Sequence, residues 1–228
     1  MLALVSMTLS WGNDRLMNSP PNSTVSPPEP ATEVTSSEYL DRLMRRGCFE
    51  ALWPLFAKAQ KPAKELTESY AALWHLRPFM KADVPVRILH VGDGAHARTA
   101  AMFSLKTQAH SISVDPQLNL PLIAAWRERF GIVRLECRKA RIEEVALELN
   151  SLPPMHTLVT FVHAHVSVDD VLDLLRWDTA FTLACCLPGK QLSRKRPASS
   201  SGVDPNVLAA GRQYQVLVNR SQSSNSRT

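Results

Sequence analysis

The pattern of apolar and polar positions divides the chain into a polar beginning, a helical stretch and a long alternation of short apolar runs with amphipathic segments. Residues 1–34 are rich in Pro, Ser, Thr and Asn and cannot bury enough apolar surface for a core, so we predict a disordered N-terminal segment. In residues 35–82 apolar side chains recur at helical spacing, which predicts a helical N-terminal extension. The polar residues 221–228 are predicted to form a disordered tail.

From Val86 onward, short β-branched runs alternate with helical patterns. The predicted strands are residues 86–91, 110–114, 132–137, 157–162, 181–187 and 214–218. The helices between them include 98–108 and 167–177; Asn119 and Ser167 are the predicted N-caps of two helices. Strands separated by helices of this length predict βαβ units, and therefore a parallel sheet with both faces covered. This domain is predicted to span residues 83–220, with a flexible basic loop at 190–206.

The turn after the first of these strands carries the candidate binding residues. Gly92 and Gly94 allow the backbone to approach a ligand, and Asp93 and Ala95 offer backbone groups beside them. The helix start that follows has free N–H groups, and Asp115, at the end of the next strand, can accept hydrogen bonds from ribose hydroxyls. This order predicts a nucleoside pocket; the alternative is a tight turn followed by a plain helix start.

Composition limits the classes of partner. The formal net charge is +5 and the isoelectric point is near 9.2, which permits an acidic partner such as RNA without requiring one. No apolar run is long enough to span a bilayer, and residues 1–11 lack the basic region of a signal peptide. The four cysteines, Cys48, Cys137, Cys185 and Cys186, have no zinc spacing. We therefore expect no membrane partner and a reducing compartment, the cytoplasm, with the nucleus or a mitochondrion as alternatives.

The stretch Ile88-Leu-His-Val-Gly-Asp-Gly resembles the first motif of class I S-adenosylmethionine-dependent methyltransferases, and the resemblance covers about Val86–Arg220. It implies S-adenosylmethionine as the cofactor, with Asp115 holding its ribose. The final strand, 213–220, resembles the closing antiparallel strand of that family. The resemblance thus implies an α/β fold: a Rossmann-like three-layer sandwich whose mostly parallel sheet ends in a C-terminal antiparallel strand, preceded here by N-terminal helices.

Two departures from the family pattern leave a second reading open. The third glycine of the first motif is absent, and Ala95, His96 and Ala97 occupy that region. The family often has an acid after the third strand that binds the adenine amino group, whereas this chain has Arg141. Arg141 is our candidate for a contact with the adenine edge, unless it is simply an exposed residue at a helix start. The departures are also those expected of an inactive domain that serves as a binding or assembly module.

The candidate catalytic residues are His163 and His165, which follow the fourth predicted strand. The stretch 161–170, with Cys185-Cys186 at the end of the next strand, is similar to a methyltransferase-like group with a His-containing turn and a Pro-Cys-Cys, although Ala184 replaces the proline. Alternation places both histidines on one face of an extended segment, at the sheet edge that opens on the pocket. Either can act as a base or orient a substrate, or be only structural. No third ligand lies at a useful spacing, so we predict no metal.

The leading functional prediction is methyl transfer from S-adenosylmethionine to an unidentified acceptor, with RNA or a protein favoured by the charge. The first alternative is the inactive module. A further alternative is an NAD(P)-binding Rossmann protein, because Gly92-x-Gly94-x-x-Ala97 satisfies the permissive dinucleotide fingerprint. The closing strand after Gly211 and the expected absence of a second substrate domain disfavour that alternative.

Overall fold

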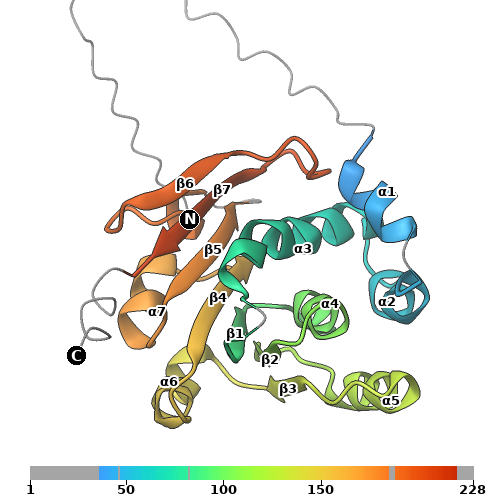
Figure 1. Cartoon of the computed structure of the whole chain (residues 1–228), viewed down its shortest axis with the longest axis horizontal. Helices are drawn as coiled ribbons and strands as arrows, with labels where there is room; N and C mark the ends of the chain where they lie inside the picture. The colour runs from blue at the N-terminus through green and yellow to red at the C-terminus, as the bar shows by residue number, and fades with distance from the viewer. Residues whose placement is uncertain (1–35, 46, 82, 185–187, 220–228) are drawn as a thin grey trace, which may run out of the picture. The chain divides into compact units, whose positions relative to one another are not determined.

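A mostly parallel sheet forms the centre of the structure (Figure 1). The computed structural model describes residues 36–219 except 46, 82 and 185–187. Within these residues seven strands pair in the order β3-β2-β1-β4-β5-β7-β6. They are β1 (Val86–Val91), β2 (His110–Val114), β3 (Leu135–Arg138), β4 (His156–Val162), β5 (Thr179–Ala184), β6 (Ala198–Val203) and β7 (Gln213–Val218). Strands β1 to β5 are parallel, and β7 is antiparallel to both β5 and β6, which confirms the predicted fold class.

Helices cover both faces of the sheet and complete three layers (Figure 1). One face carries α1 (Glu38–Met44), α2 (Phe49–Phe56), α3 (Pro62–Leu76), η1 (Arg77–Phe79), α4 (Arg98–Lys106) and α5 (Leu120–Phe130). The other face carries α6 (Ile142–Ser151) and α7 (Val168–Leu174). Because successive side chains of a strand point to opposite faces, Ile88 of β1 joins the first core cluster and Leu89 joins the second.

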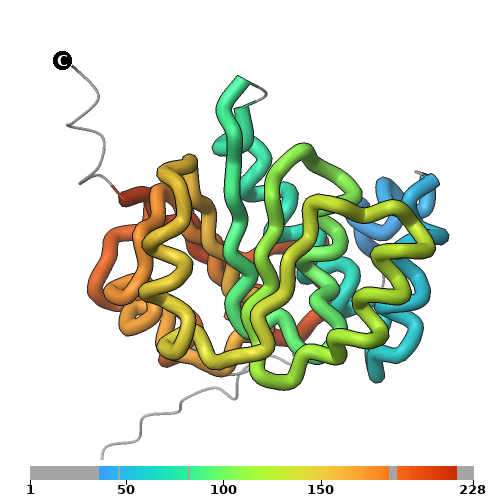
Figure 2. Tube along the Cα trace, turned by 90° about the horizontal axis from the view of Figure 1, so that it is seen from below, coloured from blue at the N-terminus to red at the C-terminus, as the bar shows by residue number. Residues whose placement is uncertain are grey.

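The N-terminal helices share the core of the sheet domain. Leu43 of α1, Phe56 of α2 and Leu76 of α3 are fully buried in the same cluster as Ile88. Figures 1 and 2 both show α2 beside α5, and the indole Nε1 of Trp126 in α5 donates to the carbonyl of Ala51 in α2 at 2.6 Å. All the described residues therefore belong to one compact unit rather than to a core and a separate helical extension.

The prediction of a flexible loop at 190–206 is wrong for much of this segment. Its first residues belong to α8 (Pro188–Gln191), and Ala198–Val203 forms the edge strand β6. An edge strand hydrogen-bonds to a single neighbour, here β7, and can remain exposed and serine-rich, so it lacks the apolar alternation that would have revealed it.

The basic residues of this segment are also less available than the sequence indicates. Arg196 pairs with Asp169 at 2.9 Å, and Lys195 pairs with Asp173 of α7 at 3.0 Å. These ion pairs reduce the positive charge that this segment could offer to an acidic partner such as RNA.

No helix among the described residues combines the length and apolar character needed to cross a bilayer.

His90 is a polar residue in the middle of the sheet. Its side chain is 1% exposed, Nδ1 lies 2.9 Å from the Thr160 hydroxyl, and Nε2 lies 3.3 Å from that of Ser111. The ring also meets the edge of Phe103 in α4. Burial lowers the pKa of His90 to about 3, because a charged imidazolium would lose its hydration inside the core.

This burial predicts a specific acid sensitivity. Between pH 6.5 and about 3 the unfolded chain binds a proton at His90 that the folded chain does not. The free energy of unfolding should therefore fall as the pH drops through this window, by at most roughly 1.4 kcal/mol per pH unit from this residue. His90→Gln should flatten that slope in urea unfolding curves measured from pH 7 to 4. An unchanged slope in the variant would contradict the assignment.

Candidate functional site

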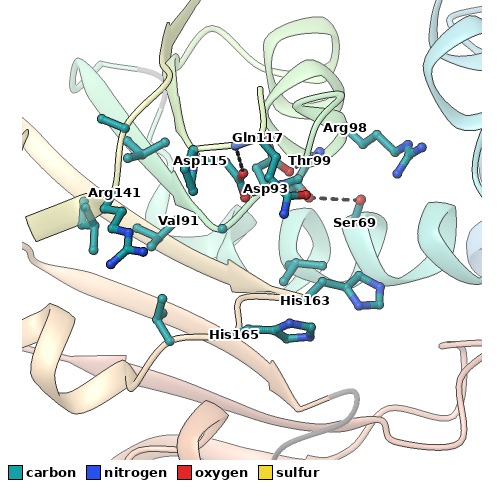
Figure 3. A pocket seen from close by; sticks show the side chains of 18 of the residues that line it. Ser69, Val91, Asp93, Arg98, Thr99, Asp115, Gln117, Arg141, His163 and His165 are labelled. Carbon is teal, nitrogen blue, oxygen red and sulfur yellow. Dashed lines mark hydrogen bonds between the residues drawn. The ribbon is translucent and has the colours of Figure 1, made fainter. Parts of the chain in front are cut away.

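A cavity of about 560 Å³ opens at the carboxyl ends of the parallel strands (Figure 3). Gly92 follows β1, Asp115 follows β2, Ala140 follows β3 and His163 follows β4, and all four line it. In open α/β sheets this edge is where ligands bind, because the connections to the helices diverge there.

The two glycines of the first turn serve different purposes. Both have positive φ, +68° at Gly92 and +71° at Gly94, a conformation that L-residues adopt at a cost. A Cβ at Gly92 would lie 2.8 Å from Cα and 2.9 Å from Cβ of Ala164, so Gly92 allows this turn to pack against the turn after β4. A Cβ at Gly94 would meet nothing within 4 Å, which leaves open space beside a residue that lines the cavity.

Asp93, between the glycines, caps helix α4. Its carboxylate accepts hydrogen bonds from the amides of Thr99 at 2.9 Å and Ala100 at 3.0 Å, and from the hydroxyl of Ser113 at 3.1 Å. Burial raises the pKa of Asp93 to about 6, while these amides oppose the rise. The carboxylate therefore occupies two of the N–H groups at the start of α4, those of Thr99 and Ala100, that would otherwise be open to an anion.

Asp115 faces the cavity and is tied to the glycine turn. Its Oδ2 accepts from the amide of Gly94 at 2.9 Å, and its Oδ1 accepts from the amide of Gln117 at 2.7 Å. An ionised carboxylate has about four acceptor positions, so two remain for a ligand. The side chain is partly exposed, as a group that meets a ligand must be.

The other predicted site residues are only partly brought together. Arg141 lines the cavity from the start of α6. Ala95 is not part of the lining, and its carbonyl instead accepts from the amide of Asn119 at 2.8 Å. His163 and His165 both line the cavity, and Figure 3 shows their rings across it from Asp115. The predicted extended segment is wrong, however: His163 has a φ of +60°, so a turn rather than alternation places the two rings.

Sequence reasoning missed the contribution of helix α3. Glu65 and Ser69 line the cavity, and Glu68 is fully buried beside them. Glu65 forms an ion pair with Arg98 at 2.5 Å, and the Ser69 hydroxyl lies 3.2 Å from that of Thr99. The only signal in the sequence is a polar face opposite the apolar stripe of this helix, and a solvated face has the same pattern.

Glu68 joins α3 to the turn after β4. Its Oε2 contacts Nε2 of His163 directly, and Nζ of Lys64 lies 3.0 Å from Oε1. The same Nζ lies 3.2 Å from Nε2 of His163. Side chains about one hundred positions apart therefore meet at the rim of the cavity.

The remaining features considered in the sequence are a metal site and the cysteine pair Cys185-Cys186. In the part of the chain that the structure describes, no three His, Cys, Asp or Glu side chains come together to hold a metal ion. Cys185 and Cys186 lie outside the described residues.

Comparison with solved structures shows the fold. A protein from Klebsiella pneumoniae assigned as an O-methyltransferase is 12% identical, with a TM-score of 0.51 over 80% of this chain and 96% of that chain. The O-methyltransferase TomG from Streptomyces achromogenes, solved in complex with S-adenosylmethionine, is 13% identical, with a TM-score of 0.48 over 80% of this chain and 95% of that chain. The bifunctional kinase-methyltransferase WbdD is 19% identical over 76% of this chain, with a TM-score of 0.42, and this chain spans 40% of its length.

No protein-family model matches the sequence, and no curated protein matches it. The similarity between this chain and the solved structures is therefore a similarity of fold.

The contrast between the two glycines gives a paired prediction. Gly92→Ala adds both backbone strain and a clash with Ala164, and should lower the free energy of unfolding by about 3 kcal/mol or more. Gly94→Ala adds strain without a clash and should cost about 1–2 kcal/mol. Chemical denaturation of the two variants measures the difference. Equal losses would mean that Gly92 and Ala164 do not approach as described.

Proposed function

We propose that the chain binds S-adenosylmethionine in this cavity and transfers its methyl group to an acceptor. The observation that carries the proposal is the Asp115 carboxylate, which is held in place by Gly94 and Gln117 yet retains acceptor positions toward the cavity. A carboxylate at the end of the second strand is positioned to accept hydrogen bonds from the two hydroxyls of a ribose.

The charges of the lining suit a cationic nucleoside better than a dinucleotide. Asp93 already accepts from the first amides of α4, so a pyrophosphate would find these donors occupied and a negative charge in its place. This disfavours the NAD(P) alternative. S-adenosylmethionine carries no phosphate, and when bound it supplies a methyl group on a positively charged sulfur.

The residues divide between the two sides of the cavity. Gly92, Gly94 and Asp115 would hold the cofactor, with Asp93 shaping the turn and Arg141 near its adenine end. His163 and His165 lie across the cavity and would face the acceptor. Methyl transfer depends mainly on alignment of the acceptor, so a pocket of this kind needs no catalytic triad. RNA or a protein remain acceptor candidates on the net charge of +5 alone.

The second candidate function is an inactive binding or assembly module. Arg141, in place of an acid at the adenine end, and the missing third glycine favour it. Such a module would keep the fold and its cavity without affinity for the cofactor.

Isothermal titration calorimetry of the full chain with S-adenosylmethionine and with S-adenosylhomocysteine separates the candidates. Binding should be detected, and Asp115→Ala should weaken it by roughly 10- to 100-fold, because hydrogen bonds to a charged group contribute about 1.5–3 kcal/mol. Absence of binding to either compound would favour the module, and binding of reduced nicotinamide dinucleotide instead would favour the dinucleotide alternative.

Asp178→Asn is the matched control. Asp178 also accepts a backbone amide next to a strand, that of Thr157 at 2.7 Å, but it lies at the opposite edge of the sheet. This variant should bind the cofactor as the wild type does. Equal loss of affinity in both variants would indicate a general effect on folding.

A further inference from the structure

A second cavity, of about 480 Å³, lies at the amino ends of β1 and β2. Val86, the first residue of β1, and Ala109, which directly precedes β2, line it. The first cavity, described above, opens at the carboxyl ends of the same strands, and the two share no lining residue, although α3 and α4, which lie side by side (Figure 1), contribute to both. A cavity of this volume is large enough for a small organic molecule.

The walls of the second cavity are mainly apolar. They come from α3 and from the segment before β1 and include Tyr70, Leu73, Trp74, Met80 and Val84. Trp74 is 39% exposed and Val84 is 40% exposed, so part of their apolar surface is not packed against the protein. The Arg42 guanidinium lies 4.5 Å from the centroid of the Trp74 ring and helps to hold the ring in place. The cavity therefore offers an aromatic surface to a flat apolar ligand.

Three cations line the second cavity beside this apolar surface. They are Arg77, Lys81 and Lys106, and within the described residues none of them forms an ion pair with an Asp or Glu side chain. Asp83 also lines the cavity, and it too has no ion pair in that part of the chain. The cations outnumber the carboxylate, so the lining carries an excess of positive charge.

Helix dipoles account for only part of this charge. Arg77 and Lys106 stand at the carboxyl ends of α3 and α4, where cations are favoured on electrostatic grounds alone. Each helix end carries about half a negative charge, so the two ends and Asp83 offset about two of the three positive charges. Arg134 also donates to two carbonyls at the end of α4, at 3.2 and 3.3 Å, which reduces the demand on Lys106 there. An excess of about one positive charge therefore remains beside the apolar surface.

The hydroxyl of Tyr70 is a further polar group of this lining. The residue is 7% exposed, and in the described part of the chain no group hydrogen-bonds to its hydroxyl. The neighbouring ring of Tyr39, 4.9 Å away between centroids, shows the usual arrangement, because its hydroxyl donates to Asp204 at 2.7 Å. Hydroxyls of largely buried side chains are ordinarily paired, so the Tyr70 hydroxyl is a donor suited to an anionic oxygen.

We propose that the second cavity binds a small aromatic carboxylate. Its flat body would lie against Trp74, and its single negative charge would meet Arg77 and Lys106, since hydrogen bonds between charged groups are stronger than neutral ones. A monoanion matches the excess of about one positive charge in the lining. The inference is independent of the proposed function, because it uses none of the residues assigned to the cofactor or the acceptor.

Calorimetric titration of the full chain with three compounds that share one aromatic body tests the charge of the ligand. Cinnamate is the anion, cinnamyl alcohol is the neutral analogue and cinnamylammonium is the cation. Cinnamate should bind at least roughly tenfold more tightly than either of the others. Equal affinity for the three compounds, or no binding of cinnamate at roughly 5 mM, would overturn the inference.

Variants of the lining should change the affinity for cinnamate in opposite directions. Arg77→Gln and Lys106→Gln each remove one positive charge and should weaken binding by roughly 5- to 10-fold. Asp83→Asn removes the carboxylate and should strengthen binding by roughly threefold. Trp74→Ala removes the aromatic surface and should weaken binding by roughly tenfold. A general effect on folding would not strengthen binding in one variant and weaken it in the others.

Lys190→Gln and Trp53→Ala are the matched controls. Lys190 is an exposed lysine on α8, and Trp53 is a 44% exposed tryptophan on α2; both lie outside the second cavity. Both variants should bind cinnamate within about twofold of the wild type, and so should Asp115→Ala, which changes the first cavity. Loss of affinity in Asp115→Ala without loss in Arg77→Gln or Lys106→Gln would place the anion in the first cavity and overturn the inference.

Discussion

The structure depends on one half-buried carboxylate, that of Asp93. It lies between two glycines with positive φ and binds the first amides of α4 and the hydroxyl of Ser113 in β2. One side chain thus joins the end of β1, the start of α4 and the neighbouring strand. The turn that results leaves Gly94 beside open space and supports Asp115 through the Gly94 amide. Asp93 therefore shapes the turn that lines the cavity, and its negative charge keeps this turn from binding an anion.

The opposite wall of the cavity depends on packing between distant segments. Gly92 has no side chain, so Ala164 can lie against it and bring the turn after β4 over the strand ends. Helix α3 then closes the rim, with Glu68 against His163. The positive φ of His163 belongs to this arrangement, because a strained backbone persists only where the surrounding contacts hold it.

Much of the architecture follows from local patterns. Apolar runs separated by helical segments indicate the parallel strands β1 to β5, and Asn119 and Ser167 cap their helices through side-chain oxygens as predicted. The edge strand β6 escaped prediction because its residues are exposed and owe their conformation to backbone pairing with β7. Arg196 likewise reads as a free cation in the sequence, since nothing local reveals its pairing with Asp169.

The sequence by itself determined that Gly92, Gly94 and Asp115 meet. They end adjacent parallel strands, and the right-handed crossover between such strands leaves one edge at which they can converge. Only the tertiary structure decided that Glu68 and Lys64 contact His163, and that Ala95 turns away from the cavity. The polar face of a helix has the same spacing whether it meets water or a buried partner, and the choice is made by packing between residues about a hundred positions apart.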